Sequence, residues 1–109
     1  MDLTTTTKLN NGVEMPWVGF GVFQTNPGKE VEDSVRWALE AGYRHIDTAA
    51  AYRNEEGVGK AVREVGIPRD ELFVTTKVWN SDQGYDSTLK AMETSLQKLQ
   101  MDYVEIGRA

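Results

Sequence analysis

The fold is decided by three consecutive stretches: Tyr43-Arg44-His45-Ile46-Asp47-Thr48, residues 54–65, and Leu72-Phe73-Val74-Thr75-Thr76-Lys77-Val78-Trp79. The first and third are rich in β-branched and aromatic residues, which predicts strands. The second predicts a helix, because its apolar residues recur at helical spacing: Val58, Ala61, Val62 and Val65. A strand, a helix and a second strand in this order indicate parallel pairing with a right-handed crossover.

Residues at the two ends of the central helix are typical of helix termini. Asn54 stands where a capping residue is expected, and Glu55-Glu56 follow in the first turn, where the helix dipole favours acids. Gly66 ends the helix. The simplest interpretation of Asn54, Glu55 and Glu56 is therefore a helix start.

Upstream of these stretches, the sequence predicts a hairpin over residues 5–15. Asn10-Asn11-Gly12 separates two short β-prone runs, and both central residues of an Asn-Gly turn tolerate positive φ. The apolar run Trp17–Phe23 lacks polar alternation, which predicts a strand buried on both faces. A helix then follows, capped by Asn26 with Pro27 at its first position. Its apolar stripe is Val31, Val35, Ala38 and Leu39, and Gly42 ends it.

Downstream, a third helix and a fourth strand are expected. Asp86 or Ser87 caps the helix, and a strand starts at residues 102–106. The apolar face of this helix is Leu89, Met92, Leu96 and Leu99. The chain is therefore predicted to be one α/β domain over residues 1–109, with the hairpin at 5–15, βα units at 17–106 and an atypical tail at 107–109.

Composition excludes several classes of partner and site. The chain has 109 residues and a net charge of −5, which argues against nucleic acid or a membrane surface as partner. It has no cysteine and a single histidine, His45, so no metal site is expected. No apolar stretch approaches the roughly 18 residues of a membrane span. The N-terminal residues lack the apolar core of a signal peptide, and we expect a cytoplasmic protein.

Asp47, Tyr52 and Lys77 form the main candidate site. Reactive residues of parallel α/β sheets collect at the carboxyl ends of the strands, where all three are expected. A phenol has a free pKa of about 10, and a nearby cation paired to a carboxylate lowers that value. The trio therefore suits a proton donor with its tuning groups.

Each candidate also has a purely structural interpretation. Asp47 and Lys77 could be an ion pair at the strand ends without chemistry, and Tyr52 could be a packing residue. His45 shares its strand parity with Asp47, but it lies nearer the start of the strand, so a structural role is favoured. Trp17, Trp37 and Trp79 would ordinarily be core residues, and only Trp79 has a position that suits a pocket.

Three separated motifs give the chain a family resemblance. They are Gly19-Phe20-Gly21-Val22-Phe23, residues 43–55 from Tyr43 to Glu55, and Thr76-Lys77-Val78-Trp79. In order and spacing they resemble the aldo-keto reductase family, in particular bacterial members that reduce glyoxals, small aldehydes or diketo sugar acids. The resemblance extends from about Thr6 to Ile106. It implies a TIM (β/α)8 barrel closed at the bottom by the hairpin, and NADPH as cofactor.

The resemblance also implies a role for each site residue. Tyr52 would be the general acid that protonates a carbonyl oxygen as hydride arrives, and Lys77 would lower its pKa. Asp47 would hold Lys77 charged and oriented. Gly21, Val22 and Asp47 would lie along the nicotinamide-ribose end of NADPH. Phe23 and Trp79 would wall the pocket of a small carbonyl substrate.

The chain departs from the family pattern in its extent. A full barrel takes roughly 250 residues, whereas this sequence supplies four of eight βα units, so we expect a truncated half-barrel. Gly107-Arg108-Ala109 stands where the family continues its fourth strand toward a catalytic histidine. Unpaired strand edges at Val18–Phe23 and Tyr103–Ile106, with an uncovered interior, predict a homo-oligomer. As a reductase, this half-barrel is expected to be inactive or weak on its own. The alternative is a non-catalytic, self-associating half-barrel.

Overall fold

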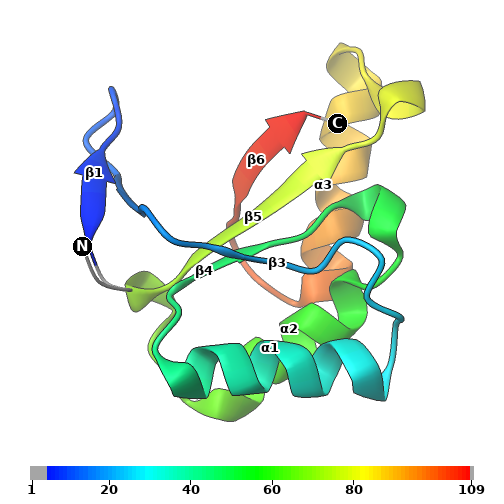
Figure 1. Ribbon diagram of the computed structural model, residues 1–109. Coiled ribbons are helices and arrows are strands. Elements are labelled where there is room, and N and C mark those ends of the chain that lie inside the picture. The colour runs from blue at the N-terminus through cyan, green and yellow to red at the C-terminus, as the bar shows by residue number, and fades with distance from the viewer. Residues whose placement is uncertain (1–4, 109) are drawn as a thin grey trace.

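The structure is a computed structural model that describes residues 5–108 (Figure 1). In chain order its strands and α-helices are β1 (Thr6–Lys8), β2 (Glu14–Pro16), β3 (Phe20–Gly21), α1 (Lys29–Ala41), β4 (His45–Asp47), α2 (Glu55–Val65), β5 (Phe73–Val78), α3 (Tyr85–Leu99) and β6 (Glu105–Arg108). Three short 3-10 turns, η1 (Ala50–Tyr52), η2 (Arg69–Glu71) and η3 (Asn80–Asp82), lie between them.

A four-stranded parallel sheet in the order β3-β4-β5-β6 organises the molecule. Gly21 lies opposite Asp47, Asp47 opposite Thr75, and Thr75 opposite Glu105. The three α-helices lie on one side of the sheet, and the hairpin of β1 and β2 lies at the amino-terminal ends of the strands (Figure 1). The predicted strand–helix alternation and the predicted edge strands are confirmed, and the described strands form an open sheet rather than a closed barrel.

The core lies between the sheet and the helices. The predicted stripe of α1 is buried in full, and Val58, Ala61 and Val62 of α2 are buried with it. They pack with Ile46 and Val74 of the sheet. Burial of this apolar surface is the main force that holds the helices against the strands.

The hairpin forms as predicted, but its turn differs. Gly12 alone has positive φ, at 86°, while the Gly12 amide donates to the Leu9 carbonyl and the Leu9 amide donates to that of Val13. This pattern is typical of a three-residue loop with glycine in the left-handed position, not of a two-residue turn. A single residue with positive φ, Gly12, is therefore enough to close this turn.

Two predicted helix starts are wrong by a few residues. α1 follows Gly28 rather than Asn26, and α3 follows Gly84 rather than Asp86 or Ser87. Gly28 and Gly84 have φ of 85° and 134°, which glycine adopts at little cost. At α1, the Glu30 carboxylate accepts a hydrogen bond from the Asn26 backbone amide at 3.2 Å. A side chain from the first turn of the helix therefore bonds the residue that was expected to cap it.

The buried strand predicted over Trp17–Phe23 is also wrong in extent. Only Phe20 and Gly21 pair as β3, and Trp17 and Phe23 are 58% and 66% exposed. A continuous apolar run does not by itself distinguish a strand from exposed aromatic loops at its ends. At the other edge, the atypical tail is partly strand, because Gly107 and Arg108 pair with Lys77 and Val78; Ala109 lies outside the described residues.

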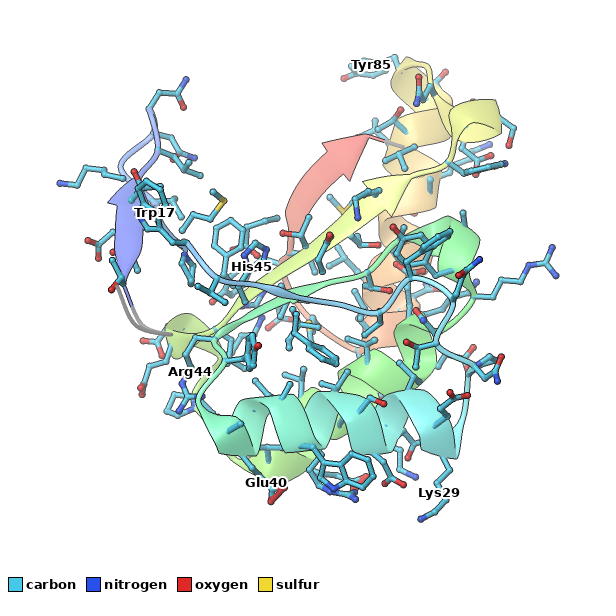
Figure 2. All side chains as sticks on the ribbon, viewed as in Figure 1. Trp17, Lys29, Glu40, Arg44, His45 and Tyr85 are labelled. Atoms are coloured by element: carbon cyan, nitrogen blue, oxygen red, sulfur yellow. The ribbon has the colours of Figure 1, made fainter. Side chains whose placement is uncertain are left out.

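The tryptophans are not core residues. Trp37 and Trp79 are 61% and 45% exposed, and Trp17 is exposed as well. Figure 2 shows Trp17 near the hairpin. The face of the sheet away from the helices carries mostly polar groups, with Asp47, Thr75 and Lys77 half-buried there. The uncovered face therefore exposes little apolar surface, apart from aromatic side chains such as Phe23 and Trp79 near the strand ends.

Candidate active site

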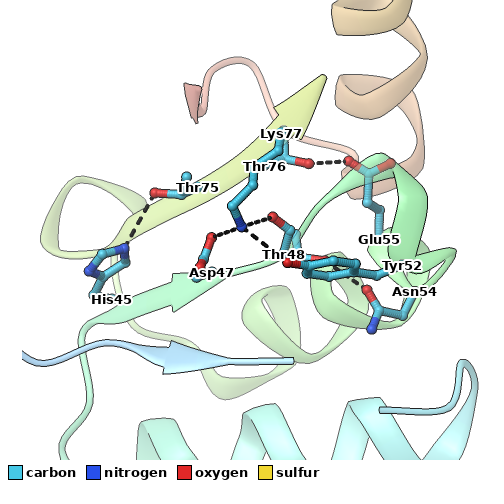
Figure 3. Close-up of polar contacts among 9 residues, drawn as sticks. All are labelled: His45, Asp47, Thr48, Tyr52, Asn54, Glu55, Thr75, Thr76 and Lys77. Carbon is cyan, nitrogen blue, oxygen red and sulfur yellow. Dashed lines mark hydrogen bonds and ion pairs between the residues drawn. The ribbon is translucent and has the colours of Figure 1, made fainter. Parts of the chain in front are cut away.

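Strand alternation puts the three predicted site residues on one face. Ile46 and Thr76 are buried against the helix side, so their neighbours Asp47 and Lys77 point to the opposite, open face. Tyr52 ends the η1 turn, which follows β4 directly. The structure thus brings the three side chains together at the carboxyl end of the sheet (Figure 3).

The Lys77 ammonium is the centre of the site. Its Nζ donates to Asp47 Oδ1 at 2.6 Å, to the Thr48 carbonyl oxygen at 3.2 Å and to Tyr52 Oη at 3.4 Å. An ammonium has three donors, so these three contacts use all of them. Nζ also lies 5.1 Å from the centroid of the Tyr52 ring. The geometry couples the phenol to a cation that a carboxylate holds in place.

The surroundings keep Lys77 charged. Burial alone lowers the pKa of the ammonium, but the hydrogen bonds to Asp47 and Tyr52 and the charge of Asp47 together outweigh it, so the pKa of Lys77 is raised above 10.5. The Lys77 side chain is 21% exposed and that of Asp47 is 38% exposed. A cation of this kind, in contact with both groups, can stabilise negative charge that develops on the phenol oxygen.

Of the two predicted pocket residues, the structure brings one to Tyr52. The ring centroids of Phe23 and Tyr52 lie 5.2 Å apart, and Phe23 remains largely exposed to solvent. Trp79 instead lines a groove of about 550 Å³ whose lining includes Glu55 and Ser95 but neither Tyr52 nor Lys77. Phe23 therefore borders the site. Trp79 shares its groove with Ala50 and Ala51 of η1, the turn that ends at Tyr52, and its place in a substrate pocket stays a prediction.

The predicted cofactor residues Gly21 and Val22 differ in their exposure. Gly21 is exposed beside Asp47, and a Cβ built on it would meet no atom within 4 Å, which leaves open backbone on which a flat ring or a sugar could lie. Val22 is fully buried, its amide donates to the Asp47 carbonyl, and its carbonyl accepts from Asn54 and Thr25. The Val22 side chain therefore belongs to the core, and a contact of Val22 with the cofactor stays a prediction.

His45 packs in the sheet, away from the Lys77 ammonium. Its ring centroid lies 4.8 Å from that of Phe73, and its Nε2 lies 3.3 Å from Thr75 Oγ1. A Cβ on Gly19 would stand 2.9 Å from the His45 Nδ1, so glycine makes room for the ring. These contacts agree with the structural role favoured for His45. Within residues 5–108, no group of three potential ligands is placed to hold a metal ion.

Two hydrogen bonds behind the site went unpredicted. Thr48 Oγ1 donates to Asn54 Oδ1 at 2.7 Å, and Thr76 Oγ1 donates to Glu55 Oε2 at 2.6 Å. Asn54 sits at the expected N-cap position of α2, but its side chain makes no capping hydrogen bond. Strand alternation could have predicted these bonds, because successive side chains of a strand point to opposite faces. Thr48 adjoins Asp47 and Thr76 adjoins Lys77, so each threonine must point toward the helices.

Comparison with known proteins places this site in a family. The pattern of the aldo/keto reductase family matches residues 17–107. The chain belongs to the aldo/keto reductase family. It is 58% identical to the glyoxal reductase of Bacillus subtilis (strain 168) over 104 residues, which are 95% of this chain and 38% of that protein. It is 50% identical to the methylglyoxal reductase DkgA of Escherichia coli (strain K12), over 94% of this chain and 36% of that protein.

Solved structures of this reductase family share the fold. An aldo/keto reductase from Brucella melitensis superimposes with a TM-score of 0.88 at 58% identity, over 93% of this chain and 39% of that one. The Bombyx mori aldo-keto reductase, solved in complex with NADP, gives 0.85 at 40% identity, over 95% and 37%. The chain thus spans less than two fifths of the length of these relatives. Among residues 5–108, no helix has the length and apolar character needed to cross a membrane.

Proposed function

We propose that this chain carries the proton-donating part of an NADPH-dependent reductase that converts small aldehydes and ketones, glyoxals among them, to alcohols. The observation that carries the proposal is the contact of the Lys77 ammonium with both the Asp47 carboxylate and the Tyr52 hydroxyl. The names of the glyoxal and methylglyoxal reductases support the substrate class.

Tyr52 is the proposed general acid. As the carbonyl carbon gains hydride, the carbonyl oxygen gains negative charge, and the Tyr52 hydroxyl gives it a proton. The phenolate left behind is stabilised by the Lys77 ammonium, which donates toward the same oxygen from 3.4 Å. Asp47 keeps the ammonium charged and aimed. The oxygen of the new alcohol therefore holds the proton that Tyr52 released.

Gly21 and Asp47 would hold the cofactor. The open backbone at Gly21 admits a flat ring, and the half-exposed Asp47 carboxylate can accept a hydrogen bond from a ribose hydroxyl. NADPH, when bound, supplies the hydride. Phe23, exposed beside Tyr52, would shield the carbonyl substrate from water on one side.

The activity test uses the chain itself. Loss of NADPH fluorescence is followed with methylglyoxal present and absent, and the alcohol product is identified. The proposal expects consumption that requires methylglyoxal and scales with protein concentration. NADPH oxidation independent of methylglyoxal would contradict it.

A second candidate function is self-association, and the sheet favours it. β3 and β6 are its edges, and exposed edges are ready to pair with another strand. Trp17, Phe23 and Trp79 add exposed aromatic surface near the strand ends. We propose that two copies of the chain associate through these edges and the uncovered face. Sedimentation equilibrium is expected to show a dimer or larger species, and a stable monomer across the concentration range would contradict this.

A further inference from the structure

Asn54 connects three parts of the chain through one buried amide. Its Oδ1 accepts from Thr48 Oγ1 at 2.7 Å, and its Nδ2 donates to the carbonyls of Val22 at 3.0 Å and Thr25 at 3.1 Å. Asn54 is 1% exposed, and both hydrogen atoms of its Nδ2 are used in these hydrogen bonds. It thereby joins the loop after β3 and the end of β4 to the first turn of α2. Figure 3 shows the bond between Thr48 and Asn54.

Both joined segments carry parts of the site. The Val22–Thr25 loop contains Phe23, whose ring lies against Tyr52. Thr48 offers its hydroxyl to Asn54, and its backbone carbonyl accepts from the Lys77 ammonium. A shift of the Asn54 amide would therefore move the Phe23 loop and one of the three acceptors of Lys77 together.

We propose that Asn54 is a positioning residue that holds Phe23 and its loop against Tyr52 and Lys77. Burial strengthens the assignment, because a buried amide that loses a partner costs more free energy than an exposed one. The inference deepens the proposed reductase function, since the surface that Asn54 orders is the one offered to the carbonyl substrate. Nothing in it requires Asn54 to touch substrate.

The competing explanation is that Asn54 serves only as the start of α2. Asn54→Asp separates the two. Aspartate can still accept from Thr48 and is favourable at a helix N-terminus, so a helix-start residue would tolerate it. A carboxylate cannot donate to the Val22 and Thr25 carbonyls, so a positioning residue would not.

The test is amide hydrogen exchange of the chain measured by NMR. In the native chain, the Val22 amide donates to the Asp47 carbonyl and the Thr25 amide to that of Val22, so both are expected to be protected. Asn54→Asp is expected to accelerate exchange of both amides by about tenfold or more and to remove the NOE between the Phe23 and Tyr52 rings. The Val58 amide, which donates to the Asn54 carbonyl, reports on α2 and is expected to keep its protection.

Glu55→Gln is the matched control. Glu55 is also buried at the start of α2, and glutamine can still accept from Thr76 Oγ1, so Val22 and Thr25 are expected to stay protected. Should Asn54→Asp fail to fold, Thr48→Val removes one of the three bonds of the amide and is expected to accelerate the same two amides to a smaller degree.

Unchanged exchange at Val22 and Thr25 with the ring NOE retained would overturn the proposal, as would equal acceleration throughout α2. Exchange needs neither NADPH nor turnover. A failure of the reductase assay would therefore leave this result standing, and a failure here would leave the role of Tyr52 untouched.

Discussion

Lys77 Nζ and Asp47 Oδ1 lie 2.6 Å apart on neighbouring parallel strands, although Lys77 is two residues beyond the position directly opposite Asp47. Asp47 is opposite Thr75, so the lysine reaches back along its own strand to meet the carboxylate. That diagonal leaves the ammonium within hydrogen-bond reach of Tyr52 as well. The pairing of two strands therefore holds the cation beside Tyr52, the proposed proton donor, which lies in the segment after β4.

The raised pKa of Lys77 predicts a stability change at high pH. A group whose pKa is higher in the folded chain stabilises it below the unfolded value and loses that contribution as pH rises through the folded value. We therefore expect the native chain to lose stability relative to Lys77→Met as pH rises above 10.5. Urea unfolding of both chains across that range measures the difference. A difference independent of pH would contradict the assigned ion pair.

Gly21→Ala tests the proposed cofactor surface without disturbing the fold. The added methyl group would meet no protein atom within 4 Å, and the backbone of Gly21 does not have positive φ. Stability is expected to be unchanged or to rise by up to about 1 kcal/mol, while the affinity for NADPH falls because the methyl group occupies the open backbone beside Asp47. Fluorescence titration and urea unfolding give the two values. Undiminished NADPH affinity would show that the cofactor does not use this surface.

Gly59→Ala, in contrast, is expected to lower the stability of the chain. A Cβ at Gly59 would lie 2.7 Å from both the Cα and the carbonyl carbon of Leu99, where α2 crosses the end of α3. Backbone atoms cannot move aside as a flexible side chain can, so the helices must separate. We expect a loss of about 1–3 kcal/mol in urea unfolding. Unaltered stability would mean that α2 and α3 do not pack this closely.

Periodicity and strand order were enough to predict the arrangement of the site. The helical spacing in residues 31–39 and 58–65 identified the buried faces, and the strand–helix alternation put Asp47 and Lys77 at the same end of the sheet. These features depend on local pattern and on the handedness of crossovers, both of which are visible in one sequence.

The features that escaped prediction depend on tertiary contacts. Asn54 was expected to act as a helix cap, but its side-chain amide instead bonds the Thr48 hydroxyl and the backbone carbonyls of Val22 and Thr25. The two carbonyls come from about thirty residues upstream. Phe23 and Trp79 were expected to wall one pocket, and the sequence could not show that Phe23 packs on Tyr52 while Trp79 lines a groove with Ala50 and Ala51. Hydrophobic character alone likewise could not place Trp17 and Trp37 outside the core.

The role of Tyr52 is tested most directly by the rate of methylglyoxal-dependent NADPH consumption in the native chain and in Tyr52→Phe. Tyr85→Phe is the matched control, because Tyr85 is 84% exposed on α3 and has no part in the site. Tyr52→Phe is expected to lower the rate by at least about a hundredfold with unchanged NADPH affinity, while Tyr85→Phe keeps the native rate. Equal rates in the native chain and Tyr52→Phe would contradict the role of Tyr52 as general acid.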